Sequence, residues 1–522
     1  MELQFIGEWL NLRGALLILP PLYVVYWLLV FVYRITFHPL AKFPGPKLAG
    51  ATFWYEFYYD IWPIQYRYMW KIEELHQKYG PIVRINPIHI HINDPQFLDP
   101  IYGSGRQKRN LDPWFSVASD SGMMGESTLQ TVDHQKHRVR KNALTRFFSK
   151  GAVRQLEGLI MDKVDRLLDR MANMHRTGKS VVNISHAAAA LSMDVISSYS
   201  LGGDMGCLAR DEWAGRWSDT FRGLGTLRPI GRQFRTLFML SLRIEPWFVR
   251  WFSPTAAEVA ERAKYPMKSI QAHIKAHEKD NQALTNTRTI FMEILDSDLP
   301  PQEKSASRLS TEAFLLLGAG TDPLTRNISV IMYYVLADQA ILERVHAELK
   351  SVISRPDSPV TLAELEALPF FSACITEGLR ITNAVSTRIP RVAHEQVIQY
   401  KQWTIPRGTP VMQSLYLVHM NPDVFPEPKK FNPQRWLDNP SLKSRYLMAF
   451  GRGTRQCLGI NLAYAEMLLS IARLLYRFDM ELFDVVKERD IDVTGDCFNG
   501  VTHDDSPGVQ VRILKDRLVD SM

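Results

Sequence analysis

The sequence predicts a mainly α-helical protein with a minor β region, built as one large domain behind an amino-terminal transmembrane helix. Three observations support this prediction. Most of the chain has apolar residues at helical spacing, two short segments alternate apolar and polar residues, and residues 14–33 form an uncharged apolar run. Of the 522 residues, 46% are hydrophobic and 22% are charged, which is typical of a folded protein with a core. Length alone would favour about three domains.

Residues 14–33 are predicted to cross a membrane, because twenty helical residues at ~1.5 Å each span the ~30 Å hydrocarbon core. A cleaved signal peptide is disfavoured by Glu2, Glu8 and the lack of a small-residue cleavage site. Basic residues follow the apolar run, so residues 1–13 should be lumenal and the bulk of the chain cytosolic. Pro20 and Pro21 predict a kink within the span.

Behind the membrane helix, residues 34–50 are rich in proline and glycine and predict an extended hinge to a catalytic domain over 51–522. Short strands are predicted over 81–94, and over 397–411 around a turn at 406–408. Helices are predicted over 136–174, 255–279, 310–353, 362–381 and 459–478.

Charge and cysteine usage narrow the class of protein. The formal net charge of +7 fits a basic docking face or attraction to anionic lipid, and the scattered basic residues make nucleic-acid binding the weakest interpretation. The four cysteines, Cys207, Cys374, Cys457 and Cys497, lie far apart without a CxxC pair, which favours a reducing compartment.

Cys457 precedes the predicted helix over 459–478, within the glycine-rich and arginine-rich stretch "FGRGTRQCLG". The positive end of the helix dipole, with Arg452 and Arg455, favours a thiolate there, and an anionic sulfur in a close loop suits a metal ligand. A buried structural cysteine is the alternative that spacing alone favours. A phosphate loop lacks its third glycine, and zinc lacks a second ligand nearby.

The positions Phe450, Gly453, Arg455, Cys457 and Gly459 resemble the FxxGxRxCxG haem-binding loop of the cytochrome P-450 superfamily. The resemblance covers about residues 40–515 and replaces the three-domain expectation with a single P-450 fold. It implies haem b with the thiolate of Cys457 as the axial iron ligand, and it places Phe450 and Arg455 at the haem.

Glu377 and Arg380 in "TEGLR" are three residues apart, the spacing of an ordinary surface ion pair. By resemblance they are instead the buried ExxR pair, completed by Arg435, that supports the cysteine loop. Breaking such a buried pair costs about 3–5 kcal/mol. Its role is structural and not catalytic.

The resemblance also assigns arginines to the haem propionates, although each arginine alone fits a solvated surface charge. "DHQKHRVRKNALTRFF" is similar to the helix with the WxxxR pattern, with His134 in place of the tryptophan and Arg138 as the arginine. Arg391, with Arg388 as the runner-up, and Arg455 are the further propionate contacts that the resemblance implies, since a propionate out of water needs a cationic partner.

Residues 314–337 resemble the oxygen-side helix, whose motif reads A/G-G-x-D/E-T-T. Ala319 to Asp322 match, and the small Gly320 leaves space against a flat ligand. Pro323 and Leu324 replace the threonine pair, whose hydroxyl interacts with dioxygen and relays protons. Either Pro323 merely fits a helix that bulges here, or proton delivery runs through Asp322, Thr321, Thr325, water or a substrate hydroxyl.

The resemblance implies a membrane-anchored monooxygenase that inserts one oxygen atom from O₂ into a hydrophobic small molecule. Electrons would come from NADPH through NADPH-cytochrome P-450 reductase, docking on a basic face that includes Arg140, Lys141, Arg452 and Arg455. The expected location is the endoplasmic reticulum membrane, with the catalytic domain in the cytosol. The chain is most similar to fungal microsomal enzymes of terpenoid, polyketide and alkaloid biosynthesis.

Two alternatives follow from the same residues. A haem-thiolate isomerase or dehydratase that does not use O₂ is compatible with Pro323 at the threonine position. A haem-binding membrane sensor would need Cys457 but neither Asp322 nor a reductase-facing charge patch. The substrate pocket is expected between 100–130, 205–255, 384–389 and 496–503, without an assigned residue.

Overall fold

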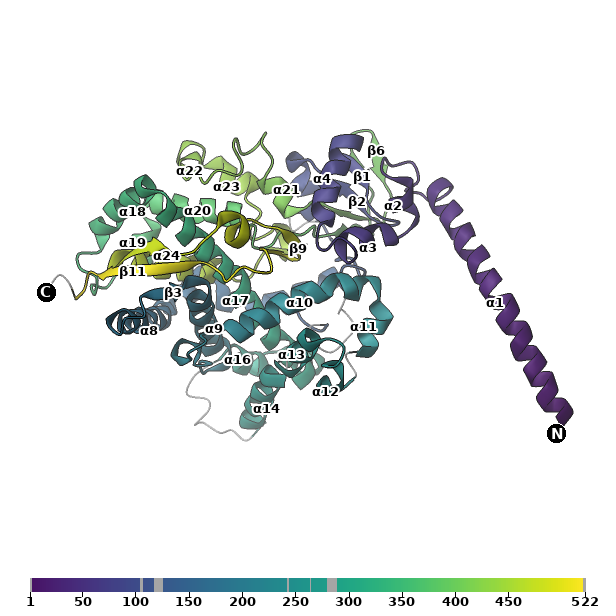
Figure 1. Cartoon of the computed structure of the whole chain (residues 1–522), viewed down its shortest axis with the longest axis horizontal. Coiled ribbons are helices and arrows are strands. Elements are labelled where there is room, and N and C mark those ends of the chain that lie inside the picture. Colours follow the sequence, from purple (N-terminus) through teal and green to yellow (C-terminus); the bar gives the residue numbers. More distant parts are fainter. Residues whose placement is uncertain are drawn as a thin grey trace. The chain divides into compact units, whose positions relative to one another are not determined.

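The computed structural model describes residues 2–103, 107–116, 125–241, 244–262, 264–278 and 289–519. These residues form two compact units, Met1–Asn93 with Val392–Met412, and Asp94–Arg391 with Gln413–Met522. The chain therefore leaves the second unit at residue 391 and returns to it at residue 413. The prediction of a mainly helical fold with small sheets is confirmed (Figure 1).

The first unit contains the predicted β region. Its helices are α1 (Glu2–Thr36), α2 (Lys47–Ala51), α3 (Trp54–Asp60) and α4 (Tyr68–Tyr79). Its strands are β1 (Ile82–Arg84), β2 (Ile90–Ile92), β5 (Ile398–Tyr400), β6 (Trp403–Ile405) and β7 (Pro410–Met412). β1 pairs antiparallel with β2, β2 pairs parallel with β7, and β5 pairs antiparallel with β6. A turn lies at 407–408 as predicted, and a second, unpredicted turn at 401–402 closes the β5–β6 hairpin.

Helix α1 contains the predicted membrane segment. It continues without a break through Pro20 and Pro21, so the kink expected from these prolines does not interrupt the helix. Its part Leu17–Thr36 is long and apolar enough to cross a membrane by length and composition. Its end is joined to the rest of the unit, because Arg34 Nη1 donates to Ala51 O at 2.8 Å and Arg84 Nη1 donates to Arg34 O at 2.8 Å.

The second unit is predominantly helical. Its longer helices are α6 (His134–Thr145), α8 (Glu157–Arg176), α9 (Ile184–Leu201), α10 (Gly215–Gln233), α13 (Pro254–Arg262), α14 (Lys264–Glu278), α17 (Ala306–Ala337), α18 (Gln339–Val352), α20 (Pro369–Thr382) and α24 (Ile460–Arg477). Its shorter helices are α5 (Leu98–Tyr102), α7 (Lys150–Gln155), α11 (Arg235–Ser241), α12 (Pro246–Val249), α16 (Ile290–Asp296), α19 (Leu362–Glu366), α21 (Leu415–His419), α22 (Gln434–Asp438) and α23 (Ser441–Tyr446).

The strands of the second unit are short. They are β3 (Val181–Asn183), β8 (Phe478–Leu482), β9 (Gly495–Cys497), β10 (Asn499–Val501) and β11 (Gln510–Asp516), while the two-residue β4 (Arg391–Val392) lies where the units divide. β3, β11 and β8 form one sheet, and β9 and β10 form a separate hairpin. These strands contribute few residues, so helix packing determines the site.

Polar caps divide the longest predicted helices. The helix expected over 310–353 ends at Asp338, whose side chain accepts hydrogen bonds from the N–H groups of Ala340 and Ile341 and begins α18. The helix expected over 136–174 is divided in the same way at Ser149, whose hydroxyl caps α7. Apolar spacing continues across both breaks, which is why periodicity alone did not reveal them.

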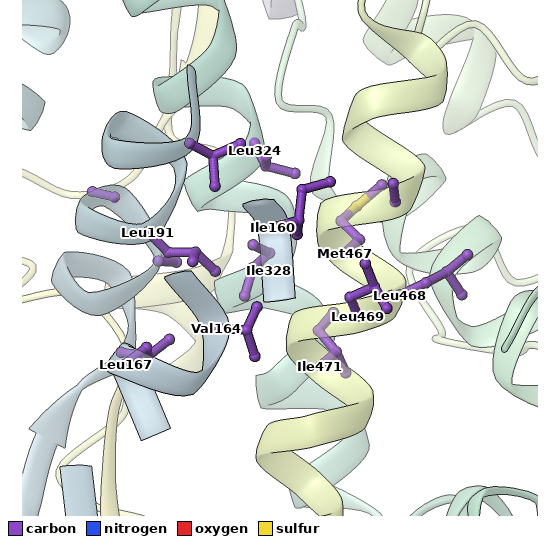
Figure 2. Packing of buried hydrophobic residues seen from close by; sticks show 14 of the residues in the cluster. Ile160, Val164, Leu167, Leu191, Leu324, Ile328, Met467, Leu468, Leu469 and Ile471 are labelled. Atoms are coloured by element: carbon purple, nitrogen blue, oxygen red, sulfur yellow. The ribbon is translucent and has the colours of Figure 1, made fainter. Parts of the chain in front are cut away.

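The core of the second unit lies between α8, α9, α17 and α24 (Figure 2). Ile160 and Val164 of α8 lie near Leu191 of α9, Leu324 of α17 and Met467 of α24, and all five are buried. This packing holds the middle of α17 and the amino end of α24 in place. Those two segments carry the residues that the sequence singles out for chemistry.

Candidate functional site

Cys457 lies in a closely folded loop immediately before α24. Its backbone N–H donates to Phe450 O at 2.8 Å, and the Phe450 ring packs against Tyr464 with centroids 5.5 Å apart. Gly453 has φ +71°, and a Cβ there would lie 2.0 Å from Gly103 O. Only glycine fits this position, because a side chain would overlap with backbone. The loop is therefore shaped by a segment more than three hundred residues earlier.

The four cysteines differ in accessibility. Cys207, Cys374 and Cys497 are buried, whereas Cys457 is exposed. Burial raises the pKa of the Cys207 thiol to about 12, as expected for an inert structural cysteine. The structural interpretation thus fits three of the four cysteines, and Cys457 is the one that can reach a ligand.

The sequence predicts that the helix dipole and two arginines favour the Cys457 thiolate. Although the Cys457 side chain is exposed, the protein atoms packed around it desolvate the sulfur and raise the pKa of the thiol, while the backbone N–H of Gly459 and the charge of Lys141 partly oppose this effect. Arg452 contributes nothing there, because it pairs with Asp99 at 2.8 Å. A metal cation would supply the missing stabilisation of the thiolate.

Two arginines near this loop, the buried Arg391 and the half-buried Arg455, form no ion pair with a carboxylate in the described part of the chain. Arg455 donates only to the carbonyls of Thr131 and Val132, at 2.8 and 2.9 Å, and its Nε has no partner. Arg391 donates to Pro390 O at 3.1 Å and lies over the Tyr102 ring. Burial lowers the pKa of Arg391 to about 10 and that of Arg455 to about 9. Both contacts predicted from the resemblance thus lie in an unneutralised cationic pocket.

Helix α6 presents different residues to this pocket than predicted. His134 is buried, and its Nδ1 has no partner among the described residues, but Arg138 is exposed. His137 and Lys141 occupy the inner face instead. Lys141 Nζ donates to Thr454 O at 3.0 Å and to Gln456 O at 2.7 Å, inside the cysteine loop.

The pKa of His137 reflects its position on the inner face of α6. Burial together with the charges of Arg455, Lys141 and Arg391 lowers the pKa of His137 to about 2. His137 and Lys141 have the same four-residue spacing as His134 and Arg138, shifted by three residues. The sequence therefore contained the pair that faces the cysteine loop, but nothing local distinguished the two helical faces.

The donor set fits a haem. An accessible sulfur suits iron, and a buried cluster of cations without carboxylates suits two propionate groups, because burying unpaired charge is costly. In addition, no group of three or more His, Cys, Asp and Glu side chains that could hold a metal ion occurs among the described residues. A cluster-type metal site is thus not found in that part of the chain.

Two of the predicted site residues on α17, Thr321 and Gly320, pack against α9 and do not lie on the exposed part of the helix. Thr321 is fully buried, and its hydroxyl lies 3.9 Å from Met193 Sδ of α9. A Cβ at Gly320 would lie 2.9 Å from Ile196 Cγ1 of α9, so this glycine serves helix packing. Ala319 is the exposed residue of this stretch. Neither Thr321 as a catalytic group nor Gly320 as a haem contact agrees with this geometry.

Asp322 faces a cavity of ≈180 Å³ that is lined by both polar and apolar side chains. Its Oδ2 accepts a hydrogen bond from Asn499 Nδ2 at 2.5 Å. Burial raises the pKa of Asp322 despite that bond and the nearby charges of Arg222 and Arg326. Thr325 also lines the cavity, and its buried hydroxyl has no partner among the described residues. Asp322 and Thr325 thus remain candidates for moving protons, while α17 passes through Pro323 without a break.

The predicted ion pair on α20 is fully buried. Arg380 donates to Glu377 at 2.7 and 2.9 Å, and neither side chain is exposed. Glu377 also accepts from Arg435 Nε at 3.2 Å and from Trp436 Nε1 at 2.9 Å. Arg380 uses its remaining donors on backbone carbonyls, including His419 O at 3.0 Å. The network is saturated, which fits a structural role.

The basic residues predicted to bind a reductase are engaged within the protein, and the exposed basic residues are different ones. Arg140 is buried against Glu303 at 2.7 Å, and Arg452, Arg455 and Lys141 are engaged as described above. Exposed cations on these helices include Lys136 and Arg138 on α6 and Arg445 on α23. None of these three has an ion pair in the described part of the chain. Because Lys141 joins α6 to the cysteine loop, the exposed side of α6 borders that loop.

Comparison with known proteins agrees with this geometry. A family model described as Cytochrome P-450 matches residues 48–507. The chain is 37% identical over 503 residues to cytochrome P-450 monooxygenase ucsK of Acremonium sp, covering 93% of this chain and 95% of the relative. It is 36% identical over 509 residues to cytochrome P-450 monooxygenase tpcC of Cochliobolus heterostrophus, covering 94% and 95%. It is also 36% identical over 480 residues to cytochrome P-450 monooxygenase sdnE of Sordaria araneosa, covering 89% and 91%.

Proposed function

The chain belongs to the cytochrome P-450 family, and we propose that it is a membrane-anchored enzyme of fungal secondary metabolism that oxidises a hydrophobic terpenoid, polyketide or alkaloid intermediate. Its relatives are monooxygenases, so the reaction incorporates oxygen from O₂, and the cofactor is haem b held by a cysteine thiolate. The observation that carries the proposal is the accessible sulfur of Cys457 in a loop that closes against the Gly103 carbonyl.

Cys457 would hold the haem iron, and Arg391, Arg455, His137 and Lys141, with His134, would hold the propionates. When bound, the haem supplies the activation of O₂. The hydrogen bond from the Cys457 N–H to Phe450 O fixes the backbone from which the sulfur projects. The cations neutralise the propionates inside the protein, where water cannot.

Asp322 is the proposed proton carrier. Burial raises the pKa of this carboxyl, so it takes up a proton more readily than an ordinary aspartate, and Asn499 fixes the orientation of its Oδ2. The cavity beside it is large enough for ordered water and has polar groups in its lining, among them Thr325, whose hydroxyl has no partner among the described residues. These groups replace the hydroxyl that Pro323 cannot provide.

Two apolar surfaces support attachment to a bilayer. The first is α1, whose residues Leu17, Leu19 and Leu29 are exposed by 62–75%. The second is on α11, α12 and the turn that follows, where Leu237, Trp247, Trp251 and Phe252 are exposed by 66–84%. Exposed aromatic groups of this kind are typical of a membrane interface. The proposed location is the endoplasmic reticulum membrane, with the catalytic part in the cytosol.

Electrons are proposed to arrive from NADPH through a diflavin reductase that docks on Lys136, Arg138 and Arg445. These cations are exposed and unpaired in the described part of the chain, so they are available to an acidic partner. Arg138, which the structure removes from the haem contacts, thereby gains a different role.

The thiolate ligand is tested by the spectrum of the reduced, CO-treated protein. The wild-type chain should show the strongly red-shifted Soret band that thiolate ligation produces, and Cys457→Ser should lose that band and NADPH-dependent turnover. Cys497→Ser is the matched control, because that cysteine is buried elsewhere and should leave the spectrum unchanged. An unaltered spectrum in the Cys457→Ser protein would refute the assignment.

A further inference from the structure

The inner face of α10 carries a cation without a hydrogen-bond partner. Arg228 lies one helical turn after Gly225, and its Cζ lies 4.1 Å from the centroid of the Phe498 ring. It makes neither a hydrogen bond nor an ion pair with any residue that the structure describes. Burial lowers the pKa of Arg228 to about 10, so the side chain is still charged at neutral pH.

Phe498 is held rigidly beneath this guanidinium. Cys497 and Asn499 pair directly across the β9–β10 hairpin, so Phe498 is the single residue of its turn. Its φ of +84° is a conformation that a bulky side chain rarely adopts. Two hydrogen bonds of 3.2 Å maintain it, from Phe498 N–H to Asp496 Oδ1 and from Ser386 N–H to Phe498 O. The ring is therefore a fixed support for Arg228.

The surroundings place Arg228 beside the proposed reaction site. The next residue of the hairpin, Asn499, donates to Asp322 of α17. Ser386, which holds the hairpin on its other side, lies five residues before Arg391, the proposed propionate contact. A ligand bound to Arg228 would thus lie between the proton-carrying aspartate and the segment that leads to the haem contacts.

Charge in this region is predominantly positive. Arg228 and Arg232, four residues apart, share one face of α10, and Arg222 lies earlier on the same helix. Arg222 donates to Thr502 at 3.1 Å, and Arg232 lies over the Phe115 ring at 5.4 Å. The nearby carboxylate of Asp496 already accepts from Ser386 and Phe498 through the same oxygen. The face therefore favours an anionic ligand.

We propose that Arg228 binds a carboxylate of the substrate, which makes the substrate class a hydrophobic carboxylic acid. The inference rests on the proposed monooxygenase function and specifies its substrate. A guanidinium offers two parallel N–H donors to a carboxylate, and Phe498 keeps its plane in position while the donors face the ligand. The apolar remainder of the acid would then extend toward Ala319 on α17.

The test is equilibrium binding to the haem-loaded full chain, followed by the shift of the Soret band. Dodecanoate and abietate are each compared with their methyl esters, which retain the apolar body and remove the charge. At least one acid should bind at least about tenfold more tightly than its ester, since a hydrogen-bonded charge contributes that much or more. Arg228→Gln should reduce the preference to less than about twofold, and Arg228→Lys should restore part of it.

Arg216→Gln is the matched control on the same helix, because its side chain is 72% exposed and makes only a long pair with Glu212. It should retain the full preference for the acid. Equal affinity for acids and esters in the wild-type chain, or an undiminished preference in Arg228→Gln, would overturn the proposal. Neither result affects the CO spectrum, so failure of the substrate class is distinguishable from failure of the proposed function.

Discussion

His419 Nε2 accepts a hydrogen bond from the backbone N–H of Met448 at 2.8 Å, while His419 Nδ1 lies 3.0 Å from Asn383 Oδ1. The carbonyl of the same residue accepts from Arg380. A single buried histidine thus joins the Glu377–Arg380 pair to the segment that leads into the cysteine loop. Since Nε2 is an acceptor, the ring is neutral, with its proton on Nδ1.

Acidification should therefore destabilise the protein through His419. Burial and the charge of Arg380 lower the pKa of this ring to about 3, below its ordinary value of 6.5. Between these two values the unfolded chain binds a proton that the folded chain refuses, so the free energy of unfolding falls as pH falls. The contribution is at most about 1.4 kcal/mol per pH unit. Denaturant unfolding from pH 7 to pH 4 should show a slope smaller by about one proton in His419→Gln. An unchanged slope would contradict the assignment.

Replacing Gly453 by alanine should prevent the cysteine loop from closing. The new Cβ would meet the Gly103 and Tyr102 carbonyls at 2.0 and 2.4 Å, both of them backbone atoms that cannot rotate away. Gly459→Ala is the control, because nothing lies within 4 Å of its Cβ position. Haem content per protein, measured from the pigment, should drop severely in the first variant and stay near wild type in the second. Equal haem content in both variants would refute the packing argument.

Restoring a threonine at position 323 tests whether proton delivery is rerouted. If Asp322 and Thr325 already supply the proton, Pro323→Thr should leave the fraction of NADPH electrons that reaches product unchanged. Asp322→Asn should lower that fraction by about 10²-fold or more, the usual contribution of a positioned proton donor. Product and peroxide are measured together against NADPH consumption. A large gain from Pro323→Thr would show that the hydroxyl is simply missing.

Charge reversal on α6 should weaken electron transfer from the reductase. Lys136→Glu and Arg138→Glu should each lower turnover severalfold at low salt and reduce its salt dependence, since rim charges act mainly on association. The CO spectrum should not change. Lys179→Glu, an exposed lysine in the turn after α8, is the control. Turnover that is indifferent to salt in the wild-type chain would count against a basic docking face.

Membrane attachment should persist in part without α1. A chain lacking residues 2–36 should still sediment with phospholipid vesicles through the aromatic surface around Trp247, Trp251 and Phe252. Replacing these three by serine should release it, because each buried aromatic side chain contributes about 1.5–3 kcal/mol. Leu514→Ser removes an exposed apolar group away from this surface and should have no effect. Complete release by truncation alone would exclude the second surface.

Local chemistry determined a large part of this protein from the sequence by itself. The small β region and most helices were predictable from short-range spacing. The haem-ligand role of Cys457 and the burial of the Glu377–Arg380 pair came from the resemblance to the P-450 motifs, because spacing alone favoured a structural cysteine and a surface ion pair. The family model and the relatives confirm the fold, the haem and the monooxygenase class that these motifs imply.

Tertiary structure decided which side of each helix carries the chemistry. His137 and Lys141, and not Arg138, face the cysteine loop, and of the two predicted proton carriers only Asp322 faces a cavity while Thr321 packs against α9. These orientations follow from how α6 and α17 are rotated against their neighbours, which local spacing does not encode. The raised pKa of Cys457 is another such property, because desolvation depends on atoms contributed from distant parts of the chain. Helical periodicity defines that a helix has two faces, and only packing against the rest of the molecule determines which of them is buried.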